Sequence, residues 1–477
     1  MTVIEHTTTS SSLAAQLAHA VEGLTWADVP DPVRSVAKAH LLDALGLALA
    51  ATGMDFGQAV HSAGTRLGGA GQARVLGFGT PLPAANAALV DGTLIHGLDF
   101  DDTHIGAIYH ATAPALAAAL AVGEAEHASG QTVLLAYVLG MEVGCRLAAA
   151  GAGRFHARGF HPTGIAGTFA AACVTAKLRG LPAATLTSAL GLCGSQAAGI
   201  LEIHESWLKR MHPGWAAHGG IIAATLAEAG FRGPATVFEG PAGLYASHIG
   251  ETPTAETLGL QDLGTRWMSA DIALKPYPCC HFIHAFVDAA AALLGELGRD
   301  RLTPEEVASI ECPTAPELMR MVTEPAERKI APKTIYDALF SVQYVVANIL
   351  VGRPVNLATF YDEPLDDPKA LAMAALVRCT PDPATDFPQH FSGEVVLTLA
   401  DGRVLRRRVA DSHGTCQDPM PEGEVLAKFT GNAGRRVPAE QAGRIAGLVR
   451  DLDQLGDVAE LVGACIATGT SEITSTD

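Results

Sequence analysis

The chain has 477 residues, of which 50 are acidic and 32 are basic, so its formal net charge is −18. Hydrophobic residues make up 48%, aromatic residues 5% and charged residues 17%. An acidic chain without a basic tract lacks the electrostatic footprint of a nucleic-acid-binding protein and has no charge attraction to an anionic membrane. The high apolar content excludes a disordered chain. We expect a globular, cytoplasmic protein with roughly two to four domains.

Neither a leader peptide nor a membrane span is predicted. Residues 1–12 are polar and lack the basic segment of a signal peptide. The stretches 105–123 and 181–201 contain no charged residue, but they are rich in alanine and include polar residues, so we expect buried helices. The nine cysteines are scattered without a Cys-x-x-Cys spacing, which argues against a zinc ribbon, a redox pair or an iron–sulfur cluster. Reduced, mostly buried thiols are expected.

The first half of the chain predicts helices. Asp31 and Pro32 form an N-cap followed by proline at the first helical position, and apolar residues recur at helical spacing until Gly53. Further helical blocks, rich in alanine and glycine, follow at residues 84–98, 113–126, 131–150, 163–178, 183–199 and 216–229. Small side chains let helices approach closely, so we expect a crowded helical bundle.

The pattern changes after residue 268. Residues 307–312 predict a strand, and residues 391–409 predict a β-hairpin with Asp401-Gly402 as its turn. Helical blocks lie between and after these strands, at residues 282–297, 336–350, 424–429 and 439–461. The predicted fold is therefore mainly α with an inserted α+β domain. A helical domain spans residues 1–268 and is completed by residues 424–477, and a smaller α+β lid domain spans residues 269–423.

Four polar segments interrupt this apolar sequence. The first holds three carboxylates and three imidazoles, from His96, Asp99, Asp101, Asp102, His104 and His110. Burying such groups together is costly unless they have a chemical task. The alternative is a solvated acidic loop that caps a helix.

The second and third segments, residues 158–164 and 207–218, combine histidines with cations. Pro162 disfavours helix at His161, so this imidazole lies beside a helix start, where it can act as an acid, a base or an anion contact. The third segment carries Lys209, Arg210, His212 and His218. Its cations can hold a substrate carboxylate beside an apolar helix start. A packed loop and an ordinary charged helix end remain the alternatives.

The fourth segment, residues 275–284, is stiffened by two prolines. It carries Lys275, Tyr277, Cys279, Cys280, His281 and His284. The two histidines have the i, i+3 spacing of a possible metal pair, but Asp288 is the only acidic residue nearby. We therefore predict no metal site.

Several enzyme classes are disfavoured by missing features. The chain has no dinucleotide-binding glycine turn, no Gly-Lys-Ser/Thr and no Gly-x-Ser-x-Gly elbow. Residues 99–102 could hold Mg²⁺ as in a terpene cyclase, but such pockets need aromatic walls. No histidine precedes an aspartate, as a helical metal-dependent phosphohydrolase would require. A pure scaffold would leave the four segments unexplained, so metal-free acid–base chemistry on a small anionic molecule is favoured.

The sequences LDFDDTH (98–104), GFHPTG (159–164), KRMHPGWAAHGG (209–220) and KPYPCCHFIH (275–284) resemble motifs of the MmgE/PrpD family. PKTIYDALFSVQY (332–344) and DPMPEGEVLAKF (418–429) continue the same order. The resemblance covers roughly residues 13–465. It implies relatives such as 2-methylcitrate dehydratase, cis-aconitate decarboxylase and iminodisuccinate epimerase. It also implies a homodimer, a helical domain with an α+β lid, and no obligatory metal or organic cofactor.

The resemblance also implies a set of pocket residues by motif position. These are Asp99, Thr103, His110, His161 and Lys209. In the decarboxylase branch, a histidine stands five residues after the lysine of the fourth segment. Here that position is Cys280, followed by His281. The cysteine is associated with the epimerase and with unassigned members, and it argues against cis-aconitate decarboxylation.

The reactions of these relatives share the loss of a proton or a carboxylate beside a carboxylate, which generates an enolate-like intermediate. We expect Lys209 and His161 to bind carboxylates and stabilise that charge. Asp99 or His110 is the expected base. The partner acid is expected on the lid, which closes to exclude water; the candidates are Cys280, His281 and Tyr277. The remaining substrate contacts are expected from Thr103, His104, Arg210, His212, Lys275 and Tyr277.

These inferences predict a cofactor-independent lyase of the dehydratase type that acts on a small hydroxy-polycarboxylate. The alternatives are an epimerase or isomerase of a dicarboxylate, a cis-aconitate-type decarboxylase, and a catalytically silent helical dimer that binds a metabolite. An acidic substrate would be repelled by a net charge of −18. We therefore expect Lys209, Arg210, Lys275 and the histidines to gather positive charge in one pocket.

Overall fold

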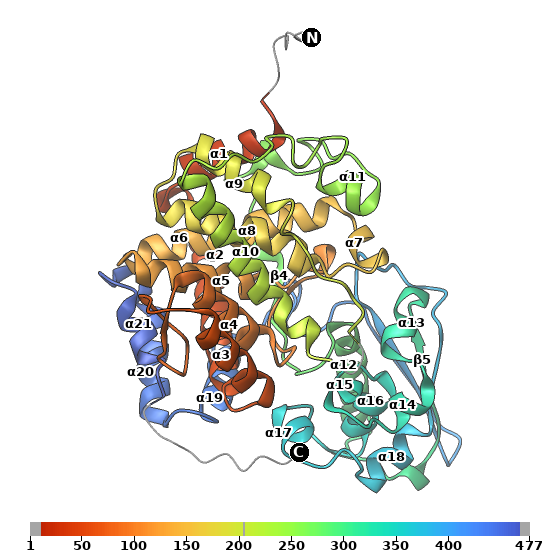
Figure 1. Cartoon of the computed structure of the whole chain (residues 1–477). Coiled ribbons are helices and arrows are strands. Elements are labelled where there is room, and N and C mark those ends of the chain that lie inside the picture. The colour runs from red at the N-terminus through yellow and green to blue at the C-terminus, as the bar shows by residue number, and fades with distance from the viewer. Residues whose placement is uncertain (1–10, 204–205, 468–477) are drawn as a thin grey trace. The chain divides into compact units, whose positions relative to one another are not determined.

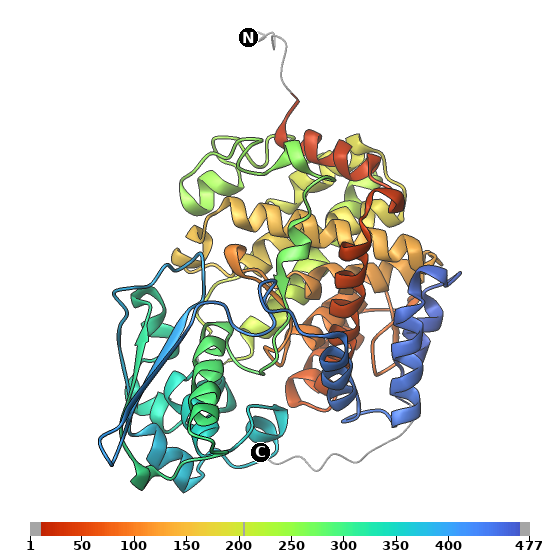
Figure 2. The same cartoon turned by 180° about the vertical axis from the view of Figure 1, so that it is seen from behind.

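The computed structural model describes residues 11–203 and 206–467 (Figures 1 and 2). The chain divides into two units. The first unit comprises Met1–Ile272 and Pro421–Asp477, and the second comprises Ala273–Met420. Helices predominate, and the only sheet of more than two strands among the described residues lies in the second unit. The predicted fold class, mainly α with an α+β part, is confirmed.

The first unit is built from helices. They are α1 (Leu13–Gly23), α2 (Asp31–Ala51), α3 (Asp55–Leu67), α4 (Ala84–His96), α5 (Thr112–Ala125), α6 (Gly130–Ala150), α7 (Arg154–Ala157), α8 (Pro162–Leu178), α9 (Ala183–Cys193), α10 (Leu208–Glu228), α11 (Leu244–Ile249), α19 (Glu422–Ala433), α20 (Ala439–Arg450) and α21 (Ala459–Ala464). Short strands join them: β1 (Ala73–Arg74), β2 (Pro81–Leu82) and β3 (Thr103–His104), with β4 (Ile272–Ala273) at the division between the units.

Helix α8 occupies the centre of this bundle. It packs against α5, α6, α9 and α10, and it is buried from Pro162 to Ala176. Helix α10 packs in turn against α4, at a point where both helices carry glycine. A Cβ atom at Gly92 would lie 2.7 Å from the Cα of Gly214, and one at Gly214 would lie 2.1 Å from the carbonyl oxygen of Leu89. The predicted close packing of small residues therefore brings the end of α4 beside the start of α10.

Helix α6 is long and apolar enough to cross a membrane by length and composition alone. However, 89% of its apolar window is buried inside the structure, as in the core helix of a folded domain. Helices α2 and α3 pass the same test only as a pair, and they are bent by 91°. The uncharged stretch 105–123 contains a short turn and most of α5, and 181–201 contains α9 and part of a loop.

Some predicted helix boundaries are wrong. Helix α9 ends at Cys193, with Gly194 as its C-cap, whereas the sequence suggested 199; Gly199 has φ of 146°, outside the helical region. Helix α10 begins at Leu208, whereas the sequence suggested 216, so the third polar segment is itself helical despite Pro213. The block 336–350 is divided at Ser341, whose side chain caps a new helix by accepting from the Tyr344 amide.

The second unit contains a four-stranded sheet in the order β6-β5-β7-β8. Strand β5 (Val307–Thr314) pairs parallel with β6 (Val377–Pro381) and antiparallel with β7 (Gly393–Leu399). Strand β7 continues through the predicted hairpin into β8 (Val404–Val409). The helices of this unit are α12 (His284–Glu296), α13 (Pro316–Val322), α14 (Ala326–Ile330), α15 (Ile335–Leu339), α16 (Val342–Leu350), α17 (Leu357–Tyr361) and α18 (Pro368–Ala374). Helix α12 packs against β7, β8 and α16.

Helix α19, the first helix of the C-terminal part of the chain, packs on α2 (Figure 2) and carries a buried cation. Lys428 Nζ lies 2.8 Å from Asp43 Oδ2 and donates to the carbonyl oxygen of Phe100 at 2.9 Å. The same ammonium lies 3.8 Å from the centroid of the Phe100 ring. Burial raises the pKa of Asp43, and the charge of Lys428 opposes that shift. This contact joins the C-terminal part of the chain to the first polar segment.

We predict that Lys428→Met destabilises the protein by about 3 kcal/mol, because it leaves the buried Asp43 carboxylate without its cation. Chemical denaturation measures this change. Lys38→Met is the matched control, because Lys38 lies 2.5 Å from Asp453 in a pair whose side chains are about a quarter exposed. The control loses less than about 1 kcal/mol. Equal losses for the two variants would contradict the anchoring role of Lys428.

Candidate functional site

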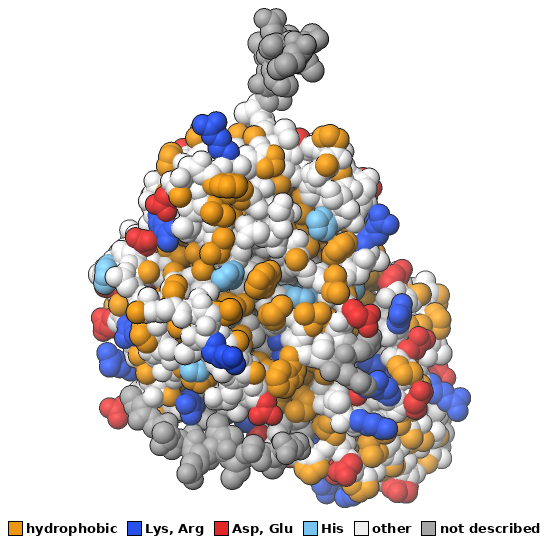
Figure 3. All heavy atoms as spheres, viewed as in Figure 1, with side chains coloured by type: hydrophobic (Ala, Val, Ile, Leu, Met, Phe, Trp, Pro, Cys, Tyr) orange, Lys and Arg blue, Asp and Glu red, His pale blue; other side chains and the backbone are white. Residues whose placement is uncertain are grey.

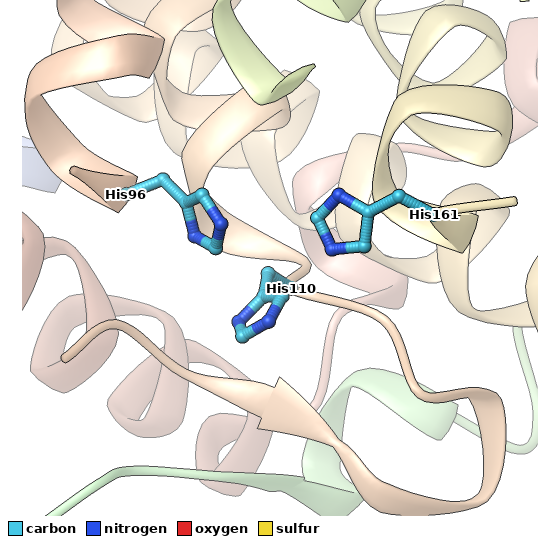
Figure 4. A group of neighbouring side chains, drawn as sticks. All are labelled: His96, His110 and His161. Atoms are coloured by element: carbon cyan, nitrogen blue, oxygen red, sulfur yellow. The ribbon is translucent and has the colours of Figure 1, made fainter. Parts of the chain in front are cut away.

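Five polar side chains of the first unit converge, although they come from distant parts of the sequence. They are His96 at the end of α4, Asp99 and His110 in the loop between α4 and α5, His161 before α8, and Lys209 in α10. The rings of His96, His110 and His161 point toward one another (Figure 4), with centroids 4.5 to 5.7 Å apart. All five residues are buried, so the alternative of a solvated acidic loop is wrong.

The ammonium group of Lys209 lies between two of these residues. Its Nζ atom is 2.6 Å from Asp99 Oδ1 and 3.3 Å from His96 Nε2. Asp99 has φ of 51°, in the left-handed region that aspartate tolerates better than most residues. Its amide donates to the His96 carbonyl at 2.9 Å. This tight turn at the end of α4 places the carboxylate and the imidazole on either side of one cation.

His110 is fixed by the backbone of the same loop. Its Nδ1 lies 2.7 Å from the carbonyl oxygen of Asp102, with Thr103 Oγ1 at 3.4 Å and Asp101 Oδ1 at 3.5 Å. A carbonyl oxygen only accepts, so Nδ1 carries the proton and Nε2 keeps its lone pair when the ring is neutral. The backbone amide of His110 donates to Thr163 Oγ1 at 3.1 Å, which ties the loop to α8.

His161 precedes the first turn of α8. Its amide donates to the Gly199 carbonyl at 3.0 Å, and its Nδ1 lies 3.0 Å from His212 Nδ1. Burial lowers the pKa of His161 well below its ordinary value, and the charge of Lys209 lowers it further. Burial also lowers the pKa of His212 to about 4, again with a contribution from Lys209. Both rings are therefore neutral at pH 7, and the expectation that they add positive charge is wrong.

The third aspartate of the loop, Asp102, has a separate set of partners. Its Oδ2 lies 2.6 Å from His40 Nδ1, and it accepts hydrogen bonds from the side chain and the amide of Thr112. Burial by itself would raise the pKa of Asp102, but the hydrogen bonds and the charge of His40 outweigh it and lower the pKa. His40 was not among the predicted site residues, because a single histidine in an apolar helix carries no sequence signal.

Two groups of side chains have the spacing of possible metal ligands: His96, His110 and His161, and His96, Asp99 and Asp101. Both groups require a ring nitrogen of His96. Its Nδ1 is bonded to Asp101, with 2.8 Å to Oδ2, and its Nε2 faces Lys209. A metal ion at either place would have to displace the carboxylate or the ammonium. The donor set fits a positively charged side chain better than a metal ion.

Residues 15–257 match the MmgE/PrpD N-terminal domain, and residues 277–454 match the MmgE/PrpD C-terminal domain. The chain belongs to the MmgE/PrpD family.

Curated relatives in this family are lyases. The chain is 28% identical to cis-aconitate decarboxylase of Aspergillus terreus over 474 residues, which are 95% of each chain. It is 27% identical to human cis-aconitate decarboxylase over 479 residues, 97% of this chain and 96% of that protein. It is also 27% identical to 2-methylcitrate dehydratase of Cupriavidus necator over 223 residues, 42% of this chain and 45% of that one. At these identities the family is established and the individual reaction is not.

Two residues that we expected to contact substrate, His104 and Arg210, have other contacts. His104 Nδ1 accepts a hydrogen bond from the Ala107 amide at 3.2 Å, and burial lowers its pKa to about 4. The Arg210 guanidinium is buried, with Cζ 4.4 Å from the centroid of the Phe56 ring. Both side chains thus have partners within the first unit.

The fourth MmgE/PrpD segment lies in the second unit and forms its own cluster. Lys275, Cys280 and His281 are buried. The Cys280 amide donates to the Leu339 carbonyl at 2.9 Å, and the Tyr277 hydroxyl donates to Asp288 Oδ1 at 2.7 Å. The rings of His281 and His284 lie 4.5 Å apart. Tyr277, Cys280 and His281 thus have contacts within the second unit.

The buried histidines predict a loss of stability in mild acid. The pKa values of His104 and His212 are about 4 in the folded protein, against about 6.5 when unfolded, so protonation favours the unfolded state. Above pH 6.5 these histidines do not lower the free energy of unfolding. As the pH falls from 6.5 toward 4, each histidine lowers it by up to about 1.4 kcal/mol per pH unit. Urea denaturation between pH 7 and 5 measures the slope. His212→Gln should reduce this slope by about the contribution of one histidine. An unchanged slope would contradict the lowered pKa of His212.

Proposed function

We propose that this protein is a cofactor-independent lyase of the dehydratase type that acts on a small hydroxy-polycarboxylate. The observation that carries the proposal is the buried ammonium of Lys209 beside an acceptor imidazole and a carboxylate. A buried cation next to neutral rings binds a carboxylate and stabilises the negative charge that develops when a neighbouring carbon loses its proton. The curated relatives, which are lyases named for carboxylic acids, support the same class of chemistry.

We assign the base to His110 in preference to Asp99. The carboxylate of Asp99 is 2.6 Å from the Lys209 ammonium, and an ion pair of this kind makes a carboxylate a weaker base. The Nδ1 proton of His110 is directed to the Asp102 carbonyl, so Nε2 is the atom that accepts a proton. A neutral imidazole fixed in one tautomer suits proton abstraction near pH 7.

The proposed reaction is an elimination. The base takes the proton from the carbon beside a substrate carboxylate, and that C–H electron pair becomes the new C=C bond. The C–O bond to the hydroxyl group breaks with its electron pair, and a protein acid supplies a proton so that water leaves. We expect the fourth segment to supply this acid. Cys280, His281 and Tyr277 are the candidates, and individual substitutions distinguish them.

Decarboxylation is the second candidate, because the relatives that match over nearly the full length are cis-aconitate decarboxylases. In that reaction the C–C bond to a carboxylate breaks, carbon dioxide leaves, and the bonding electron pair stays on carbon as a carbanion. The same ammonium stabilises that charge, and a protein acid then protonates the carbon. Against it, the resemblance places a histidine in decarboxylases where this chain has Cys280. Epimerisation, in which the removed proton returns to the other face, is the remaining alternative.

One experiment separates these reactions. Proton NMR in D₂O is run on a panel of hydroxy-tricarboxylates, cis-aconitate and amino-dicarboxylates. A new alkene signal that depends on a hydroxy acid supports the dehydratase. Loss of carbon dioxide from cis-aconitate supports the decarboxylase, and solvent exchange without elimination supports the epimerase. Absence of turnover and exchange throughout the panel would contradict the proposal.

Two substitutions test the roles within the cluster on whichever acid is turned over. Lys209→Met should lower kcat/KM by at least about 100-fold, because it removes the buried positive charge. His110→Gln should lower kcat by about 100- to 10,000-fold with a smaller change in KM, because it removes the base. Steady-state kinetics measures both. Wild-type turnover by either variant would contradict the corresponding assignment.

We also propose that the protein is a homodimer, as the family resemblance implies, with α10 at the interface. Trp207, Met211 and Trp215 are spaced by four residues and are 51%, 36% and 42% exposed. On the face seen in Figure 3, hydrophobic side chains are frequent and charges are sparse where α10 lies in Figure 1. Exposed aromatic residues of this kind are typical of protein interfaces.

We also propose that the protein is cytoplasmic. The described cysteines are all free thiols, which supports this location.

The dimer is tested by Trp215→Glu. Sedimentation velocity should show a dimer for the wild type and a shift to monomer for the variant, because a buried charge in an apolar interface is costly. Leu67→Glu is the control, since Leu67 is 67% exposed and lies outside this stripe. A wild-type monomer, or a variant that remains fully dimeric, would contradict the assignment of this surface.

A further inference from the structure

We propose that Asp101 and His96 act as a positioning pair that holds the Lys209 ammonium in its productive place. The pair does not need to touch substrate. Its proposed role is to set the tautomer of His96, so that the ring presents an acceptor to Lys209. This inference deepens the proposed function and depends on it only for the kinetic consequence, because the tautomer can be observed without turnover.

The geometry forms a chain of contacts across the end of α4. The Asp101 carboxylate lies 2.8 and 2.9 Å from His96 Nδ1 through its two oxygens. The opposite ring nitrogen, Nε2, lies 3.3 Å from Lys209 Nζ. His96 and Asp101 are each 1% exposed, so solvent does not replace these contacts.

The chemistry of the two neighbours fixes the protons. An ionised carboxylate only accepts hydrogen bonds, so the proton of the neutral ring is on Nδ1. An ammonium group only donates, so the lone pair is on Nε2. Asp101 and Lys209 therefore both select the Nδ1–H tautomer of His96, and the Nε2–H tautomer satisfies neither of them. A doubly protonated ring would direct an N–H group at the ammonium at 3.3 Å and repel it.

The pair of Asp101 and His96 also gives Lys209 an acceptor that a substrate does not displace. The Lys209 ammonium contacts the carboxylate of Asp99, and a substrate carboxylate that approaches the ammonium competes with Asp99. The Asp101 charge acts on Lys209 through a polarised imidazole, as the orienting carboxylate does in other histidine-containing sites. The ammonium therefore keeps an acceptor, His96 Nε2, while Asp99 yields its place to the substrate.

The decisive variant is Asp101→Asn, which changes one atom of the side chain. An amide can offer its N–H₂ group to Nδ1, which moves the ring proton to Nε2 and turns it toward Lys209. We expect kcat to fall by about 10- to 100-fold, with a smaller change in KM. Asp91→Asn is the matched control, because Asp91 lies in α4, the helix that carries His96. Asp91 is buried, accepts from the Leu76 amide at 2.9 Å, and has its pKa raised by burial, so an amide replaces it at little cost to activity.

A second pair of variants tests His96 directly. His96→Gln can donate to Asp101 and accept from Lys209, whereas His96→Leu can do neither. We expect Gln to retain several-fold more activity than Leu. In a Lys209→Met background, Asp101→Asn should cause no further loss of kcat, because both changes act through the same ammonium. Equal losses for Gln and Leu, or additive effects in the double variant, would overturn the proposal.

A spectroscopic measurement separates this inference from the proposed reaction. With ¹⁵N-labelled histidine, the ring signals of His96 are assigned by their loss in His96→Gln. The wild type should show the Nδ1–H tautomer, and Asp101→Asn should show a shift toward Nε2–H. An Nε2–H wild type overturns the positioning pair even if the enzyme is active. A confirmed Nδ1–H tautomer without turnover of any acid would leave the pair intact and count against the proposed function.

Discussion

The arrangement of the first unit depends on one buried ammonium group. Lys209 is 8% exposed, and removing a charge from water is costly unless acceptors of good geometry surround it. Asp99 and His96 supply them, and both come from the last turn of α4 and the residues after it. The close approach of α4 and α10 at Gly92 and Gly214 makes this distance possible. The left-handed backbone of Asp99 then turns its carboxylate to the same cation. The glycines at the contact of α4 and α10 and the left-handed backbone of Asp99 thus serve the same need, which is to bring acceptors to the buried ammonium of Lys209.

Three aspartates within four residues would repel one another if they shared an environment. The structure separates them by giving each a different cationic or hydrogen-bonding partner. Asp99 contacts Lys209, Asp101 contacts His96, and Asp102 contacts His40 and Thr112. Lys428 adds a fourth contact by donating to the carbonyl of Phe100. The loop is therefore held from α10, α4, α2 and α19, and its rigidity comes from elements that span almost the whole chain.

Much of this could be predicted from the sequence. The apolar spacing located the long helices, and the Asp401-Gly402 turn located the hairpin, because these signals are local. The polar segments predicted Asp99, His110, His161 and Lys209 as site residues, because clustered polar groups are costly to bury in an apolar chain unless they have a chemical task. The partners were harder to see. His40 and Lys428 lie in helices whose patterns are ordinary, and only tertiary packing brings them to the loop. The role of His96 was also hidden, because its two neighbours, not its own position, define its tautomer.

The charge state of the site changes how a carboxylate can be recognised in an acidic protein. The neutral rings of His161 and His212 add hydrogen-bonding capacity without adding charge. Lys209 therefore supplies positive charge that His161 and His212 do not, and it already faces Asp99. Under the proposed function, binding of an anion exchanges one carboxylate partner of Lys209 for another, and the net charge of the buried region becomes more negative by one. The neutral imidazoles make that exchange tolerable, because they can donate to the added negative charge, and their low pKa values keep them from competing with Lys209 for it. A buried site of this composition selects a ligand by the placement of its oxygen atoms as well as by its charge.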